Sequence, residues 1–436
     1  MHNMPEIVLH HQFDMNIPEQ MFIHFGNRSI KVKVTVNSKH NTGSSNYCFI
    51  PPSTASKFSI PSGDYLIYKY DSLNLYIGPV VAVLTAGNNK RPYPVGRQAR
   101  LFKELSSQAI KQGVFLYYFC PEGYRINHTS IKGYRYDEKG NRLIGNFPYP
   151  NIVYNRVLYR SIERQPFIQS ILNSFIKDPQ VHLFNTRFLN KWEVNQELSK
   201  GIGQIYLPET KKYNLINLRT CLKTYPEVFL KPINNSKGKG IIKIVNLGNE
   251  NYSLARAEWR NKPSLKFNSL EGLIRFTEKH KITLRHYIVQ QGIELATYNG
   301  RVFDLRTQYQ KDKQGNWIMT GVGARVAGIN RFVTHVPNGG YLANYSEIIK
   351  QVFPNPDIQL SINRELDKIG QTIPALLEHQ LRINLGILSF DIGLDKQGKL
   401  WILEINSKPA SFDEDDIRGN HLKHLVDYYI YAASQK

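Results

Sequence analysis

The sequence predicts an α/β protein of three parts: a small β-rich N-terminal domain, an open α/β domain and a larger α+β domain. Three patterns predict it. Alternating apolar and polar residues come first, a strand–helix–strand unit follows, and two hairpin patterns lie in the C-terminal half. The chain has 436 residues, which is too long for one ordinary domain. The expected boundaries are 1–75, 76–185 and 186–436.

The β-rich part is predicted from residues 30–36, IKVKVTV, in which apolar and polar side chains alternate. A period of two is typical of a strand with one buried face. The polar segment 37–46 that follows is typical of a turn or loop. This region contains no pattern that indicates a chemical site.

The open α/β domain is predicted from two apolar runs, 78–87 and 114–119, which read as buried parallel strands. Between them lies a helical pattern with a terminal glycine, carried by Leu101, Leu105, Ala109 and Gly113. Residues 151–157 predict a further strand. No G-x-G-x-x-G follows the first strand, which argues against a dinucleotide-binding domain.

The third part mixes helices with two hairpins. Helices are expected at 191–200, 269–280 and 361–381, with a kink at Pro374 in the last. Two pairs of apolar runs are each joined by a D-x-x-G tetrapeptide, which is a hairpin signal: 302–310 with 316–326, and 387–394 with 399–406.

The second hairpin carries acidic residues inside apolar strands. Asp391 lies in ILSFDIGL, and Glu404 and Asn406 share one face of LWILEIN. A buried carboxylate is costly unless it is paired or bound to a metal, and Mg²⁺ prefers such oxygen ligands. The pattern therefore indicates either an Mg²⁺ site or ion pairs with nearby Lys or Arg residues on the sheet.

A glycine-rich basic loop follows an apolar strand at 229–241, FLKPINNSKGKGI. Glycines let the backbone approach an anion closely, and Lys231, Lys237 and Lys239 add positive charge. The loop is not a Walker A motif. It indicates either a phosphate-binding loop or an ordinary basic turn.

Two further segments carry candidate polar groups. The strand 287–295 ends in Gln-Gln-Gly-Ile-Glu, which suits contacts with a purine edge and, through Glu294, with ribose hydroxyls. Asp304 and Arg306 share one face of the first hairpin, and Arg325 lies on its partner strand. Two guanidiniums in one cleft suit a phosphate or carboxylate, although a surface Asp304–Arg306 ion pair is the alternative.

Composition leaves the class of partner open. Lys and Arg number 56 against 35 Asp and Glu, a formal net charge of +21 that attracts polyanions, but the basic residues are spread along the chain. Three distant cysteines, Cys48, Cys120 and Cys221, argue against disulfides and zinc and fit a reducing, cytoplasmic compartment. Neither a membrane helix nor a secretory signal is expected.

Four elements, in their order along the chain, resemble the ATP-grasp superfamily, which includes glutathione synthetase, D-alanine–D-alanine ligase and the RimK-type ligases. They are the basic loop 229–241, the strand 287–295 and the two hairpins. The resemblance covers about 186–415, and the region before it looks like a pre-ATP-grasp domain. Several motifs resemble more closely the YheC/YheD family of endospore coat-associated proteins: NKWEVNQEL (190–198), YLPET (206–210), SKGKG (236–240), GARVAG (323–328), NGGYLANY (338–345) and LEINSKPA (403–410).

The resemblance implies a role for particular residues. Lys191 and Lys231 match nucleotide-contacting lysines, and the loop of Ser236, Lys237, Gly238, Lys239 and Gly240 matches the segment that folds over the phosphates. The adenine hinge matches Gln290, Gln291 and Ile293, and the ribose contact matches Glu294. The Mg²⁺ ligands match Asp391, Glu404 and Asn406. Arginines that hold the γ-phosphate or an acyl phosphate match Arg306 and Arg325.

This sequence departs from the related ligases at three places. Ser389 stands where D-alanine–D-alanine ligases carry an arginine, so Arg325 would have to supply that charge. Residue 190 is Asn where Asp is expected. Lys408 follows the metal Asn, where it would either repel a cation or attract an acidic substrate.

The resemblance implies an ATP- and Mg²⁺-dependent ligase that joins a carboxylate, on an acidic or peptide substrate, to an amine through an acyl phosphate. A link to the spore or envelope is implied by the family. Two alternatives stay open: a coat component that keeps the fold without catalysis, and a polyanion-binding protein driven by the net charge of +21. The second would show steep salt dependence, and nucleic acid is not the expected partner.

Overall fold

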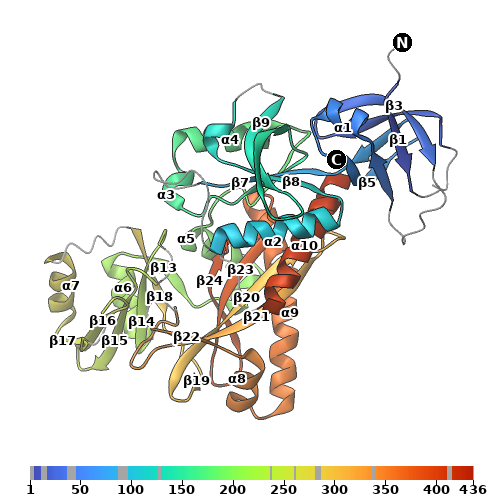
Figure 1. The fold of residues 1–436 in the computed structure, drawn as a ribbon. Coiled ribbons are helices and arrows are strands. Elements are labelled where there is room, and N and C mark those ends of the chain that lie inside the picture. Colours follow the sequence, from blue (N-terminus) through green and yellow to red (C-terminus); the bar gives the residue numbers. More distant parts are fainter. Residues whose placement is uncertain are drawn as a thin grey trace.

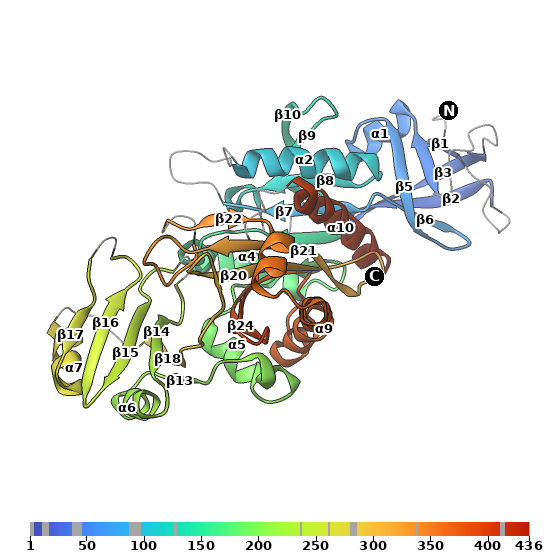
Figure 2. The same ribbon diagram turned by 90° about the horizontal axis from the view of Figure 1, so that it is seen from below.

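The computed structural model describes residues 4–10, 17–36, 46–86, 97–125, 129–235, 238–259, 262–279, 286–335, 339–409 and 415–435. Four sheets organise these residues (Figures 1 and 2). The α/β class expected from the sequence is confirmed. No helix of the described part is long and apolar enough to span a membrane.

The first sheet is a closed barrel of six strands in the order β1-β3-β2-β6-β5-β4. In β3 the alternation noted in the sequence points Val32 and Val34 inward. The barrel elements are β1 (Glu6–Leu9), β2 (Gln20–Phe25), β3 (Arg28–Val36), β4 (Tyr47–Ile50), α1 (Pro52–Phe58), β5 (Gly63–Tyr70) and β6 (Asn74–Ile77).

The second sheet has the order β10-β9-β8-β7-β11-β12. Its parallel strands are β7 (Val80–Leu84), β8 (Phe115–Phe119), β11 (Ile152–Asn155) and β12 (His182–Phe184). The antiparallel strands β9 (Ser130–Tyr136) and β10 (Arg142–Pro148) extend one edge. Its helices are α2 (Arg97–Lys111), the 3-10 turn η1 (Pro121–Gly123), α3 (Arg160–Glu163) and α4 (Pro166–Lys177). As predicted, Gly113 ends the α2 region with a φ of +68°.

The third sheet is antiparallel, in the order β13-β18-β14-β15-β16-β17. Helices α6 (Leu215–Thr224) and α7 (Leu270–Lys279) cover one face, where Leu218 and Leu273 pack on Val228 and Leu230 (Figure 2). The opposite face carries Lys231. The strands are β13 (Thr210–Lys212), β14 (Glu227–Pro232), β15 (Ile242–Gly248), β16 (Asn251–Arg256), β17 (Leu265–Phe267) and β18 (Tyr287–Gln291).

The fourth sheet has the order β22-β21-β20-β23-β24, with β19 (Thr297–Tyr298) added to β20. Helix α9 (Pro356–Leu381) packs on the face formed by Leu305, Tyr309 and Phe390. The strands are β20 (Arg301–Lys311), β21 (Trp317–Val326), β22 (Tyr341–Ala343), β23 (Ile387–Leu394) and β24 (Leu400–Asn406), and the other elements are α5 (Lys191–Leu198), the 3-10 turn η2 (Ile202–Tyr206) and α8 (Tyr345–Val352).

Both predicted hairpin turns are present, but α9 begins earlier than expected. Asp312 Oδ1 accepts from the N–H groups of Gln314 and Asn316, each at 2.9 Å, and Gly315 takes a φ of +80°. Helix α9 starts at Pro356 rather than at 361, because the Asn355 side chain caps it, with an accepted bond of 2.8 Å from Asp357 N. Pro374 lies inside the helix.

The C-terminal helix α10 (Asp415–Ser434) lies beside α2 in both views, although the two helices are far apart in sequence (Figures 1 and 2). Its Leu425 and Val426 belong to the same apolar cluster as Val81 and Phe102. The second sheet and the end of the chain therefore share one core.

Candidate nucleotide and metal site

The two predicted metal carboxylates lie opposite each other. Asp391 of β23 pairs in register with Glu404 of β24, and Ser389 pairs with Asn406. The period of two turns Leu388 and Phe390 toward α9 and leaves Ser389 and Asp391 on the other face. Asp391, Glu404 and Asn406 thus share one face of the sheet.

Two arginines, one on β20 and one on β21, neutralise Asp391. Asp391 Oδ1 lies 3.0 Å from Arg325 and 3.3 Å from Arg306. Burial would raise the pKa of Asp391, but these arginines outweigh it and lower the pKa to about 2. Arg306 also donates to Ser389 Oγ at 3.2 Å. Its guanidinium therefore lies beside the position where the D-alanine–D-alanine ligases carry an arginine and this chain has Ser389.

Arg325 is almost fully buried, with 4% of its surface exposed. Its Nε and one Nη donate to the two oxygens of Asp304, both at 2.8 Å, and Thr334 adds a hydroxyl donor to Asp304 at 2.6 Å. The surface Asp304–Arg306 pair, the sequence alternative, is therefore replaced by a buried cross-strand Asp304–Arg325 pair. Arg325 neutralises carboxylates here, and its contact with a transferring group stays a prediction.

The donor set fits Mg²⁺. Asp391 uses Oδ1 for both arginines, and Glu404 uses Oε1 for Lys191 at 3.0 Å. Within the described residues no hydrogen bond or ion pair uses Oδ2 of Asp391 or Oε2 of Glu404. Two carboxylate oxygens and the nearby Asn406 amide are the number and kind of protein ligands that Mg²⁺ takes beside phosphate and water.

Lys231 enters the site from the third sheet. Its ammonium donates to Gln290 Oε1 at 2.5 Å, and Gln290 in turn donates to Thr210 at 2.9 Å. Burial lowers the pKa of Lys231 to about 8, with Glu404 opposing this shift and Lys191 adding to it. Lys231 therefore lies near the carboxylates of the fourth sheet, and it forms no ion pair within 4 Å among the described residues.

Lys191 connects the two sheets. It is the first residue of α5, which Asn190 caps by accepting from Glu193 N at 2.8 Å, so Asn serves where Asp was expected. The Lys191 ammonium donates to Asn235 O at 2.6 Å and to Glu404. The start of the basic loop and a predicted metal ligand thus meet at one lysine.

The basic loop is described in part. Ser236 and Lys237 lie outside the described residues. Gly238 and Gly240 take φ angles of +71° and +78°, and Lys239 is exposed. A Cβ on Gly240 would lie 2.8 Å from Pro232 Cγ, so this turn needs glycine.

The predicted adenine hinge lies at the end of β18. The N–H groups of Gln291 and Gly292 already donate to Glu209 O and Glu227 O, at 2.8 and 2.9 Å. Ile293 and Glu294 follow them, and Glu294 is exposed and forms an ion pair with Lys396. The contacts of Ile293 and Glu294 with a base and a ribose stay predictions.

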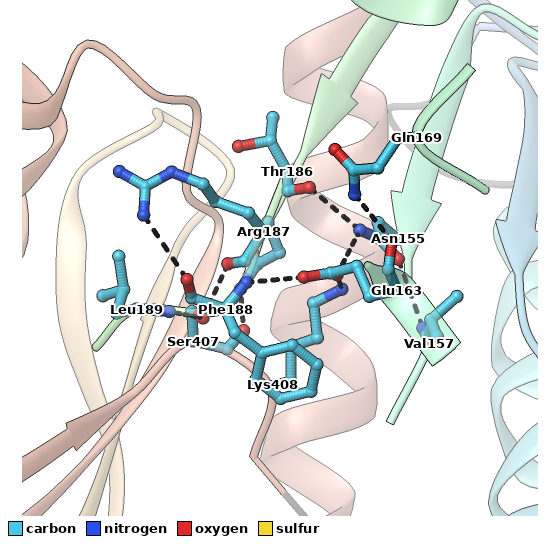
Figure 3. A network of polar contacts seen from close by, with 11 residues as sticks. Asn155, Val157, Glu163, Gln169, Thr186, Arg187, Phe188, Leu189, Ser407 and Lys408 are labelled. Carbon is cyan, nitrogen blue, oxygen red and sulfur yellow. Dashed lines mark hydrogen bonds and ion pairs between the residues drawn. The ribbon is translucent and has the colours of Figure 1, made fainter. Parts of the chain in front are cut away.

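Both sequence interpretations of Lys408 are wrong. Its side chain is buried and forms an ion pair with Glu163, whose carboxylate lies at the end of α3 (Figure 3). A lysine held in this way neither faces a metal nor is free for a substrate. Sequence reasoning also missed Glu163 and His335. Burial lowers the pKa of His335, which lies near Asp391 and Arg325.

Comparison with known proteins decides the family. The model of the YheC/D-like ATP-grasp family matches residues 180–433, more than half of the chain. The chain belongs to the YheC/D-like ATP-grasp family. The resemblance stated from the motifs is thereby confirmed, together with the ATP-grasp fold.

Two curated relatives come from Bacillus subtilis (strain 168). The endospore coat-associated protein YheD is 27% identical over 80% of this chain and 75% of its own. The endospore coat-associated protein YheC is 24% identical over 70% of this chain and 84% of its own. Among solved structures, the D-alanine-D-alanine ligase from Coxiella burnetii covers 82% of this chain and 95% of its own at 11% identity, with a TM-score of 0.42, too distant to carry an argument.

Membership in the YheC/D-like ATP-grasp family supports an ATP-dependent, ligase-like function in general terms. ATP-grasp proteins generally use ATP and Mg²⁺. In the described residues Lys191 forms an ion pair with Glu404, and Lys231 lies near enough to Glu404 and Asp391 for their charges to affect its pKa. The three cysteines form no disulfide with one another.

Proposed function

We propose that this protein is an ATP- and Mg²⁺-dependent ligase that joins a carboxylate to an amine through an acyl phosphate. The observation that carries the proposal is the meeting of Lys191 and Lys231 with Asp391 and Glu404 across two sheets. A coat component that keeps the fold without catalysis has no need of a buried lysine near two carboxylates of the kind that bind metals. The names of the relatives suggest that the acceptor belongs to the spore.

The proposed roles follow from position. Lys191 and Lys231 bind the ATP phosphates, Asp391, Glu404 and Asn406 hold the metal, and Ile293 and Glu294 bind the nucleoside. Mg²⁺ bound there supplies charge neutralisation of the phosphates. Arg306, at the border between Asp391 and Ser389, stabilises the transferring phosphoryl group as a substrate carboxylate attacks it in line. The amine then displaces phosphate.

Nucleotide binding tests the first half of the proposal. Mg²⁺–ATP raises the melting temperature of the wild-type protein, because a ligand that binds only the folded state stabilises it. Glu404→Gln removes the charge that holds the metal and reduces this shift. An equal shift in the variant would contradict the metal assignment.

Trapping of the acyl phosphate tests the second half. Amino acids and short peptides serve as carboxylates, and hydroxylamine serves as the amine. An active ligase forms a hydroxamate with release of one phosphate per product. If nucleotide binds but no hydroxamate forms across the panel, the non-catalytic coat component becomes the better account.

A further inference from the structure

The residues that follow Asn406 are held mainly by the segment 155–189 and not by their own sheet (Figure 3). Ser407 donates its hydroxyl to Arg187 O at 2.9 Å and accepts from Leu189 N at 3.2 Å. Its carbonyl accepts from the side chain of Asn185. The chain leaving the metal strand is thus fixed from the end of the second sheet.

Lys408 is the attachment that carries a charge. Its ammonium pairs with Glu163, and the two side chains are 1% and 4% exposed. The same carboxylate accepts from Asn155 Nδ2 and from Phe188 N, both at 2.9 Å. The lysine also lies over the Phe188 ring, 4.9 Å from its centre. Glu163 is therefore fully engaged, and neither charge faces solvent.

Asn185 extends the attachment to the other metal strand. It adopts a φ of +50°, a conformation that Asn tolerates better than most residues. Its Oδ1 accepts from Gly386 N and Ile387 N, at 2.9 and 3.2 Å, and its Nδ2 donates to Ile387 O at 2.7 Å. The start of β23 and the end of β24 are thereby bound to one side chain.

We propose that the Glu163–Lys408 ion pair is a positioning pair that fixes the end of β24 and so sets Asn406 and Glu404 for metal-dependent nucleotide binding. This rests on the proposed function. A buried ion pair gives little net stability compared with apolar packing, so a purely structural role explains it poorly. Groups that orient metal ligands typically change metal affinity by about ten- to hundredfold. Lys408 lies two residues from Asn406, which is close enough to act in this way.

A matched control exists between α9 and β20. Glu378 accepts from Lys311 at 2.9 Å, from a backbone N–H (Leu385) at 2.8 Å and from a side-chain N–H (Trp317) at 3.0 Å. Glu378 thus accepts from the same kinds of donor as Glu163: a lysine, a backbone N–H and a side-chain N–H. An aromatic ring also lies beside the lysine in both groups. Lys311 lies five residues along β20 from Arg306, about 17 Å at the rise of a strand.

The experiment compares two double variants of the full chain, Glu163→Gln with Lys408→Met and Glu378→Gln with Lys311→Met. Each removes both charges, so no lone buried charge prevents folding. Binding of a fluorescent ATP analogue is measured in EDTA and across a Mg²⁺ titration. The first double variant raises the Mg²⁺ midpoint at least tenfold and changes binding in EDTA less than twofold, and the control moves neither. A midpoint within twofold of wild type, or an equal shift in both, overturns the proposal.

Hydrogen exchange on the nucleotide-free protein separates this proposal from the proposed function. Amides of residues 404–408 exchange faster in the first double variant than in the control and the wild type. If the wild type binds no nucleotide, the proposed function fails, and the exchange rates still decide whether the pair fixes the end of β24. Unchanged exchange there overturns the positioning role even when nucleotide binds.

Discussion

Asp391 lies directly opposite Glu404 in the β23–β24 ladder, yet the two carboxylates are neutralised from different sides. Arg325 and Arg306 bind Asp391 from within the same sheet, whereas Lys191 reaches Glu404 from α5. Asp391 is thus part of the sheet's own charge network, and Glu404 belongs to the boundary between sheets. The two acids should therefore respond differently to loss of charge.

Asp391→Asn should destabilise the protein by roughly 2–3 kcal/mol, because the buried Arg325 loses one of its two carboxylate partners and keeps Asp304. Glu404→Gln, at a more open pair, should destabilise it by about 1–2 kcal/mol. Both variants should lose the Mg²⁺-dependent part of nucleotide binding. Guanidinium unfolding and nucleotide titration in Mg²⁺ and in EDTA measure the two effects. Equal destabilisation would show that Arg325 does not depend on Asp391.

Binding of ATP at pH 8.5 should be accompanied by proton uptake at Lys231. The folded protein holds the pKa of this lysine at about 8, below its ordinary value, so most of the amine is neutral at pH 8.5. Phosphate charge favours the ammonium form and raises the pKa, which gives uptake of up to about 0.7 proton per site. At pH 6.5 the lysine is already charged and this uptake disappears.

Calorimetry in two buffers with different ionisation enthalpies measures this uptake. Lys231→Met should abolish it, while Lys239→Met, at an exposed position on the loop, should preserve it. Absence of uptake in the wild type at pH 8.5 would mean that Lys231 does not meet the phosphates.

The same lowered pKa fixes the direction of a stability change. Between pH 8 and about 10.5 the unfolded chain binds more protons at residue 231 than the folded protein does, so this lysine makes folding more favourable as the pH rises. Lys231→Met should flatten that part of the pH–stability curve. Lys408, whose pKa burial also lowers to about 8 against the opposing effect of Glu163, contributes in the same direction.

Gly240→Ala should weaken nucleotide binding more than its backbone angle alone explains. A Cβ there would approach Tyr287 Oη to 2.9 Å as well as Pro232, and the φ of +78° adds strain. Gly248 has a φ of +84° with nothing near its Cβ position, so Gly248→Ala isolates the angular strain, about 1–2 kcal/mol. A Kd for ATP raised roughly tenfold in the first variant alone corresponds to about 1.4 kcal/mol. Equal affinities would remove Gly240 from the phosphate-binding loop.

Local patterns predicted the parts of the site that depend on short spacing. The D-x-x-G turn with Asp395 predicts the hairpin between two apolar strands, but the β23–β24 register shifts between Asp391 and Ile392, so the pairing of Asp391 with Glu404 cannot be counted from the turn. The pairing of Arg325 with Asp304 could not be predicted from short spacing either. Opposing Arg325 to Asp304 depends on the β20–β21 register, which shifts at a bulge between Gln308 and Tyr309 and cannot be counted from the turn alone.

Long-range pairs were not readable at all. Glu163 and Lys408 are 245 residues apart, and each alone resembles an ordinary surface charge. Lys408 was therefore placed near the metal by its sequence neighbours, whereas burial against Phe188 turns it away. Helix α9 shows the smaller local error: apolar spacing begins after Pro356, but the Asn355 cap starts the helix.

Arg331→Ala should speed the release of nucleotide. Its guanidinium, from the segment between β21 and β22, donates to the carbonyls of Ala257 and Trp259 beyond β16, so one side chain joins the two sheets that flank the site. Loss of this fork lets the sheets separate, and Arg331→Lys should restore only part of the effect because lysine lacks the paired donors. Stopped-flow displacement of a fluorescent nucleotide should give a dissociation rate about tenfold higher, the equivalent of about 1.4 kcal/mol. Arg301→Ala is the control, since the Arg301 guanidinium lies over the Tyr341 ring of its own sheet. If both variants release nucleotide at the wild-type rate, the Arg331 contact does not hold the site closed.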